Sequence, residues 1–190
     1  MNMKHKKFRN KNPYRGKPKR DDDDMKIKLA SPQNAPAGSA DVAIGISRKV
    51  FEEVWAYAGS DTSKELGGII LGSRAADSER PGAQKVLVQG YVTAKHTEAL
   101  RGSVTFTHQS WDGMHQEREE KYPRLSIVGW FHTHPGFGIF LSSYDLFIHQ
   151  NFFDLPWQIA YVLDPLNRQE GFFCWRNGQI EPCDFQILEA

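Results

Sequence analysis

The sequence predicts an α+β fold, a single domain in which one mixed, mostly antiparallel sheet is flanked by helices. Its 190 residues are the length of one ordinary domain. Segments with apolar residues at helical spacing alternate with short apolar runs rich in β-branched and aromatic residues. An Asn-Gly pair between two such runs near the end of the chain indicates a hairpin.

The first half of the predicted domain holds one helix and two strands. Residues 47–58 predict a helix that Ser47 can cap. Its apolar face comprises Val50, Phe51, Val54, Trp55 and Ala58. The glycine-bounded run LGGIILG at 66–72 predicts a buried strand, and residues 85–92 predict a second strand. The polar residues 73–83 predict a turn between the two strands.

The second half predicts two helices, at 108–121 and 143–153, among further strands. The inner side of the first of these helices is expected to comprise Trp111, Met114, His115 and Arg118. Strands are expected at 103–107, 125–133, 157–163, 171–175 and 179–183. The segment LSIVGWFHT at 125–133 is the strongest candidate for a central strand. Asn177-Gly178 should join the last two strands through a type I′ turn.

The net charge of +1 hides two unlike parts of the chain. Residues 1–24 hold nine Lys or Arg and four Asp, which leaves a net charge of −4 on the rest. Such a segment has little to bury and predicts disorder. A linker containing Pro, Gly and Ser follows at 31–41. We therefore expect a disordered tail and linker at 1–41 and a folded domain at 42–190.

Composition also bears on partners and compartment. No apolar run approaches the roughly 18 residues of a membrane-spanning helix, and no apolar stretch follows the basic start as in a secretory signal. Two cysteines, Cys174 and Cys183, are too few for a disulfide-stapled secreted scaffold. We expect a cytoplasmic protein without a membrane partner. The basic arm is the only hint of nucleic-acid binding, which is otherwise not expected.

The segment GWFHTHPGFGIFLSSYD at 129–145 carries the chemistry. Alternate side chains of a strand share one face, so His132 and His134 project together as half of a zinc site. Pro135 ends the strand, and a Gly-rich loop leads to a helix that opens at Ser142. Asp145 falls in the first turn of this helix, where a carboxylate is favoured.

Two histidines and one carboxylate form a catalytic rather than a structural zinc set, since the fourth position stays open for water. A nearby base can take a proton from that water, and Glu65 just before LGGIILG is available. Each residue taken alone has a simpler explanation. The histidines can be packed or exposed, Ser142 and Asp145 can form a helix cap, and Glu65 can be a loop acid.

Together these residues are specific. Glu65 before LGGIILG, then His132-x-His134-Pro135, six residues and Ser142-x-x-Asp145, resembles the JAMM motif of the JAB/MPN/Mov34 metalloprotease family. The resemblance covers residues 42–185 and implies the MPN fold. It also implies one catalytic Zn²⁺ bound by His132, His134 and Asp145.

The resemblance further implies a zinc-dependent isopeptidase or peptidase that cuts a ubiquitin-like protein from conjugates or from a C-terminal extension. In this mechanism Glu65 is the general base on the zinc water and later protonates the leaving amine. Ser142 donates a hydrogen bond to the oxyanion. The chain resembles compact bacterial members of defence operons, whose partners include ubiquitin-activating and ubiquitin-conjugating enzyme-like proteins. Compact members that process sulfur carriers are an equally open comparison.

Residues around the motif carry further expectations. Some eukaryotic relatives bind a second zinc through a histidine at the position of Phe147 here, so that site is not expected. His149 is either support for the metal site or a surface histidine. We expect Trp130 in the core. Phe137 and Phe140 are expected to contact substrate beside a groove in which an extended tail adds to a sheet edge.

Three other interpretations remain open at this point. A non-catalytic MPN scaffold should have damaged ligands, whereas no motif position is substituted. A DNA-associated, RadC-like relative would use a similar pair of histidines, and the basic arm favours it. A non-haem iron oxygenase also uses two histidines and a carboxylate, but it leaves Glu65 and Ser142 without a role. Cysteine-protease chemistry is discarded because Cys174 has no motif partner.

Overall fold

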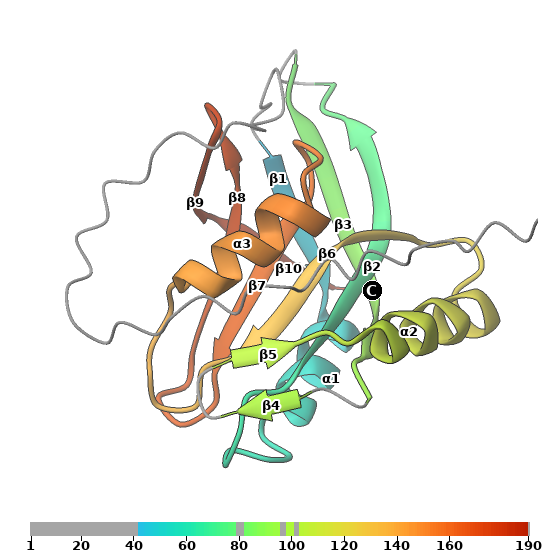
Figure 1. Ribbon diagram of the computed structural model, residues 1–190. Helices are drawn as coiled ribbons and strands as arrows, with labels where there is room; N and C mark the ends of the chain where they lie inside the picture. Colours follow the sequence, from blue (N-terminus) through green and yellow to red (C-terminus); the bar gives the residue numbers. More distant parts are fainter. Residues whose placement is uncertain (1–41, 79–81, 96–97, 101–102, 190) are drawn as a thin grey trace, which may run out of the picture.

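The computed structural model describes residues 42–189 except 79–81, 96–97 and 101–102 (Figure 1). The tail and linker expected at 1–41 lie outside these described residues. Within them, eight strands form one sheet in the order β10-β1-β3-β2-β6-β7-β8-β9. Their bounds are β1 Val42–Ser47, β2 Gly67–Ala76, β3 Gln84–Thr93, β6 Ser126–Thr133, β7 Ile159–Asp164, β8 Gln169–Arg176, β9 Gln179–Cys183 and β10 Phe185–Leu188.

Helices cover both faces of this sheet (Figure 1). The other elements are α1 (Arg48–Ala58), α2 (His108–Lys121), α3 (Ser143–Phe152) and a small ladder of β4 (Glu98–Leu100) with β5 (Ser103–Thr105). Val50, Val54 and Ala58 of α1 bury their side chains in one apolar cluster on the sheet. Met114 of α2 and Ile148 of α3 belong to a second cluster. The protein is therefore a three-layer α+β domain, as the sequence predicts.

The sheet is mixed and mostly antiparallel. Parallel pairs join β1 to β10, β1 to β3 and β6 to β7, and the other neighbours run antiparallel. The crossover from β6 to the parallel strand β7 runs through α3, because parallel neighbours need a long connection. The N-terminus of α3 consequently follows the carboxyl end of β6, where the two motif histidines lie.

Most of the expected elements are present with small shifts of their ends. Ser47 caps α1 by accepting a hydrogen bond from the amide of Val50. Asn177 and Gly178 both have positive φ, and they connect β8 to β9 in the expected hairpin. Strands β1, β4 and β10 were not predicted from the sequence. Strand β1 is short and contains a glycine, and its pairing with β3 and β10 is non-local.

Two local expectations were wrong. Strand β2 continues through Ala76, because residues 73–76 pair with β3 although their side chains are exposed. The polar composition of residues 73–83 predicts a turn, so the sequence does not indicate this half of the strand. His115 is exposed instead of lying on the inner side of α2. The buried residues of α2 are Ser110 and Met114, four positions apart, and His115 falls just beside their row.

Gly129 lets β6 and β7 approach each other. A Cβ at this position would lie 1.9 Å from the carbonyl oxygen of Ile159. We expect Gly129→Ala to lower the free energy of unfolding by about 1–3 kcal/mol or more, since one of two paired backbones must move. The matched change Gly113→Ala meets no atom within 4 Å on α2 and should stabilise by about 0.5–1 kcal/mol. Denaturant unfolding of both variants measures this, and equal effects would contradict it.

Candidate metal centre

The two motif histidines lie at the carboxyl end of β6. His132 is paired on both sides, with Gly67 of β2 and Val162 of β7, so its backbone is fixed in the centre of the sheet. His134 follows directly, and its amide donates to the carbonyl of Leu163 at 2.8 Å. Both imidazoles are buried. The neighbouring strands therefore hold the two rings close together at the end of β6.

Asp145 comes from the first turn of α3. Its side chain accepts a hydrogen bond from the amide of Ser142 at 2.7 Å, while the Ser142 hydroxyl accepts one from the amide of Asp145 at 3.2 Å. This reciprocal capping box fixes the start of the helix. The other carboxylate oxygen, Oδ1, faces His132, while the capping oxygen Oδ2 also lies near His134. Cap and candidate metal ligand are therefore the same side chain.

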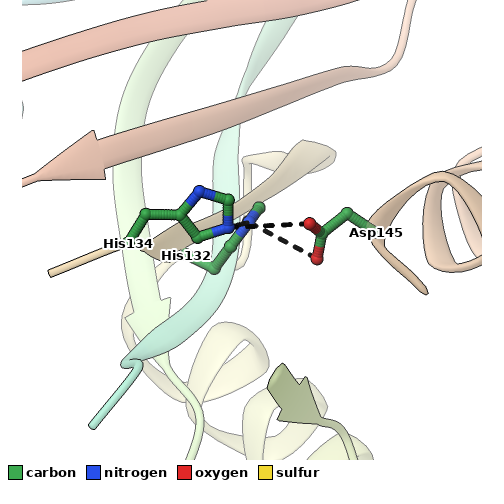
Figure 2. A group of neighbouring side chains, drawn as sticks. All are labelled: His132, His134 and Asp145. Carbon is green, nitrogen blue, oxygen red and sulfur yellow. Dashed lines mark hydrogen bonds and ion pairs between the residues drawn. The ribbon is translucent and has the colours of Figure 1, made fainter. Parts of the chain in front are cut away.

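The ligating atoms of these three residues converge on one point (Figure 2). The Nε2 atoms of His132 and His134 are 3.0 Å apart. Asp145 Oδ1 lies 3.4 Å from the Nε2 atom of His132, and Oδ2 lies 3.6 Å from that of His134. Two ligands of one tetrahedral zinc ion, each 2.0–2.1 Å from it, are about 3.3 Å apart. The spacing and chemistry of this donor set thus fit a zinc ion.

The pKa values of the two imidazoles shift in opposite directions. Burial lowers the pKa of His132, although Asp145 opposes the shift. Burial also disfavours the charged form of His134, but Asp145 and Glu65 together raise its pKa. For Asp145 burial acts upward, and the histidines and Ser142 outweigh it and hold the pKa of the carboxyl well below its usual range. These shifts favour an ionised Asp145 and a neutral His132, the protonation states that metal ligands need.

Glu65 also reaches this cluster. Leu66 donates its amide to the Thr133 hydroxyl and accepts from the Thr133 amide, both at 2.8 Å. These bonds tie the start of β2 to the end of β6. Glu65 is buried, and its Oε1 lies 4.0 Å from the Nε2 atom of His134. The structure thus brings together all five residues singled out from the sequence, with Ser142 joined to the others through Asp145.

A third buried histidine, His149, supports the site from behind. Trp130 is fully buried, as expected, and its ring stacks on that of His132 with centroids 4.6 Å apart. Its indole nitrogen donates to the Nδ1 atom of His149 at 3.0 Å. His149 is also fully buried, so the surface alternative for this residue was wrong. The row His149, Trp130, His132 fixes the position of one candidate ligand.

His149 should make the metal-free protein less stable in mild acid. Burial lowers the pKa of His149 from 6.5 to about 3, so between these values the unfolded chain binds the extra proton. Well above pH 6.5 the group has no effect on the free energy of unfolding, and its destabilising effect grows as the pH falls through and below that value. From pH 7 to 5 it should remove about 2 kcal/mol from the free energy of unfolding.

His149→Gln tests this expectation, because glutamine keeps an acceptor for Trp130 but does not titrate. Urea unfolding at the two pH values should show a shallower pH dependence in this variant than in the wild type. An identical pH dependence in both proteins would contradict the prediction.

The chain belongs to the JAB family, described as JAB1/Mov34/MPN/PAD-1 ubiquitin protease, whose sequence profile matches residues 40–155. This confirms the family and the MPN fold expected from the motif. The protein is 35% identical over 83 residues to the NAD(+) hydrolase TcpA of a Theionarchaea archaeon, which is 43% of this chain and 25% of that protein. It is 48% identical over 46 residues to the 26S proteasome regulatory subunit rpn11 of Schizosaccharomyces pombe, 24% of this chain and 15% of that protein.

A longer match is with COP9 signalosome complex subunit 5 of Saccharomyces cerevisiae. It is 31% identical over 135 residues, which is 66% of this chain and 30% of that protein. The matched segments thus make up less than a third of each of these relatives. The solution structure of DSY2949 from Desulfitobacterium hafniense shares the fold with a TM-score of 0.56 at 18% identity. It covers 77% of this chain and 94% of that one.

None of the helices in the described part of the chain is long and apolar enough to span a bilayer.

Proposed function

We propose that the protein is a zinc-dependent peptidase or isopeptidase that releases a ubiquitin-like protein from a conjugate or from a C-terminal extension. The observation that carries the proposal is the position of Glu65. Three ligand atoms converge on one point, and the carboxylate of Glu65, two residues before β2, approaches the same point without belonging to that set. Three protein ligands leave the fourth tetrahedral position for water, and a buried acid outside the ligand set is placed to take a proton from that water.

The residues of the chain divide the chemistry of amide hydrolysis between them. A zinc ion held by His132, His134 and Asp145 would supply Lewis-acid activation of the water and of the scissile carbonyl. Glu65 takes the proton of the attacking water as its oxygen bonds to the carbonyl carbon. The same carboxyl then gives this proton to the amine nitrogen as the carbon–nitrogen bond breaks.

Ser142 is proposed as the donor to the oxyanion. Its hydroxyl accepts from the backbone amide of Asp145, and a side-chain hydrogen bond from Ser142 is among the causes that lower the pKa of the Asp145 carboxyl. The hydroxyl sits at the N-terminus of α3, where the helix dipole also favours negative charge. A donor at this place is typically worth a few kcal/mol of transition-state stabilisation.

The substrate class is supported by the relatives and by the surface beside the site. The matched relatives include proteasome regulatory subunits and the ubiquitin carboxyl-terminal hydrolase RPN11 of Saccharomyces cerevisiae. Phe137 and Phe140 are 57% and 37% exposed in the loop after the histidines. Phe140 lies 4.6 Å from the His134 ring, so it can contact a chain bound at the metal. Partners with ubiquitin-activating or ubiquitin-conjugating activity, and a role in bacterial defence, belong to the same proposal.

Cleavage by the zinc-loaded full chain tests the function. The panel consists of ubiquitin, sulfur carriers and other ubiquitin-like proteins, each with a C-terminal extension and as a lysine conjugate. NAD⁺ is included because the archaeal relative is named as a hydrolase of it. Mass spectrometry locates the cut, and metal analysis gives the zinc content.

Cleavage that phenanthroline abolishes and zinc restores supports the proposal. Iodoacetamide should not inhibit, because Cys174 is fully buried and its hydrogen bond with Cys183, together with burial, raises the pKa of the Cys183 thiol. Stoichiometric zinc without cleavage of any fusion would overturn the substrate class. Absence of zinc binding would overturn the proposed function as a whole.

A further inference from the structure

One buried carboxylate lies outside the motif and binds two loops at once. Asp164 ends β7 and is fully buried. Its Oδ1 accepts from the amides of Gly136 (2.8 Å), Leu166 (3.1 Å) and Asn167 (3.1 Å). Its Oδ2 accepts from the amide of Gly138 (2.7 Å) and from the side-chain nitrogen of Asn167 (2.7 Å). Five N–H donors on one carboxylate fill its acceptor sites.

These bonds keep the carboxylate charged. Burial would raise the pKa of Asp164, but hydrogen bonds from Gly136, Asn167 and Gly138 lower it to about 2. Hydrogen bonds to an ionised acceptor are about twice as strong as neutral ones. The loop that follows His134 is therefore held more firmly than its glycines and its exposed surface suggest.

The same loop contacts a candidate metal ligand, His134. The carbonyl of Gly138 lies 3.2 Å from Nδ1 of His134, while the amide of the same glycine is held by Asp164. A carbonyl only accepts, so Nδ1 must carry the proton, and Nε2 is left with its lone pair toward His132 and Asp145. Gly136 and Gly138 both have φ of +83°, the left-handed region that allows their amides to turn toward Asp164.

We propose that Asp164 is a positioning residue of the metal centre, which holds the 136–138 loop so that the Gly138 carbonyl fixes the tautomer and ring plane of His134. The inference rests on the proposed metal site. It concerns residues that the motif does not include. Partners of this kind commonly set ligand orientation, and their loss costs about 10–100-fold in metal affinity.

Asp164→Asn is the direct test. Asparagine keeps the shape but turns one acceptor oxygen into a donor, which must then face amide donors. Zinc affinity, measured by competition with a chromophoric chelator, should fall about 10–100-fold. The visible absorption spectrum of the Co²⁺-loaded protein should change, because the His134 ring no longer has one orientation. In the metal-free protein, at a pH above the pKa of His134, ¹⁵N NMR should show a mixture of tautomers in place of Nδ1–H.

Asn167→Ala is the matched control. It removes one donor to the same carboxylate but none of the bonds to the 136–138 loop. Both variants should melt at a lower temperature than the wild type, since each disturbs a buried hydrogen-bond network. Only Asp164→Asn should alter zinc affinity and the cobalt spectrum.

A second pair of variants covers the case in which Asp164→Asn does not fold. Gly136→Ala places a Cβ at positive φ in the loop held by Asp164. Gly178→Ala places the same strain in the turn between β8 and β9. This turn lies at the opposite end of β8 from Gly171, the residue that pairs with Val162 of β7. The first should weaken zinc binding and alter the cobalt spectrum. The second should do neither.

The outcomes separate this inference from the proposed function. Wild-type affinity and an unchanged cobalt spectrum in Asp164→Asn, or in Gly136→Ala if that variant is used, would overturn the positioning role and leave the metal site intact. If the wild type itself bound no zinc, the proposed function would fail. The tautomer of His134 in the metal-free proteins would then still decide the inference, with Nδ1–H kept in Asp164→Asn counting against it.

Discussion

Replacing Glu65 with glutamine is expected to lower kcat by about 10²–10⁴-fold, the usual contribution of a general acid–base group. Glutamine has nearly the same shape but cannot take a proton from the attacking water. The change lies outside the set of three converging ligand atoms, so zinc content should stay at the wild-type level. The measurement is the cleavage rate of a fusion substrate at saturating concentration, together with metal analysis.

Glu119→Gln is the matched control, since Glu119 is an exposed glutamate on α2 with a 70% exposed side chain. It should cleave at the wild-type rate. A Glu65→Gln variant that also retains wild-type kcat would remove the general-base role and require another proton acceptor. Loss of zinc in this variant would instead make Glu65 part of the ligand set.

Replacing His132 with alanine is expected to abolish zinc binding and cleavage together. Its Nε2 is one of the three converging atoms, and alanine offers no ligand atom in its place. In the wild type, zinc at about 1,000 times its Kd should stabilise the fold by about 4 kcal/mol. For a domain of this size that corresponds to a rise in Tm of about 8–16 °C.

The zinc-induced shift in Tm is the appropriate measurement for this variant. Truncation of a buried ring lowers Tm with or without metal, whereas the difference between zinc-loaded and chelator-treated protein isolates binding. His132→Ala should show no shift, and His115→Ala, at an exposed histidine of α2, should show the wild-type shift. A full zinc-induced shift in His132→Ala would contradict the proposed ligand set.

The parts of the fold that could be predicted are those with a local signal. The apolar stripe and serine cap of α1, the central strand β6 and the Asn-Gly hairpin of β8 and β9 all follow from neighbouring residues. Strands β1 and β10 could not be predicted, because each is short and forms its hydrogen bonds with a partner strand far away in the chain. The second half of β2 could not be predicted either, because exposed polar residues can form strand hydrogen bonds as well as apolar ones.

The metal site divides in the same way. The spacing His132-x-His134 on one strand, and Asp145 in the first turn of the next helix, are local patterns, so the three ligands can be proposed from neighbouring residues alone. Convergence of their ligating atoms within a few ångströms depends on the β6–α3–β7 crossover. Glu65 joins them only because β2 pairs beside β6, 67 residues away along the chain.

The family, the fold class and the five motif residues could all be inferred from the sequence. Four of these residues lie at short, fixed spacing, and Glu65 is marked by its place just before LGGIILG. The burial of His149 behind Trp130, and the hydrogen bonds by which Asp164 holds the loop after His134, could be found only in the folded protein. Neither role has a local signal, since a histidine on a helix and an aspartate after a strand are common at surfaces. Their burial and partners arise only when strands and loops distant in sequence pack together.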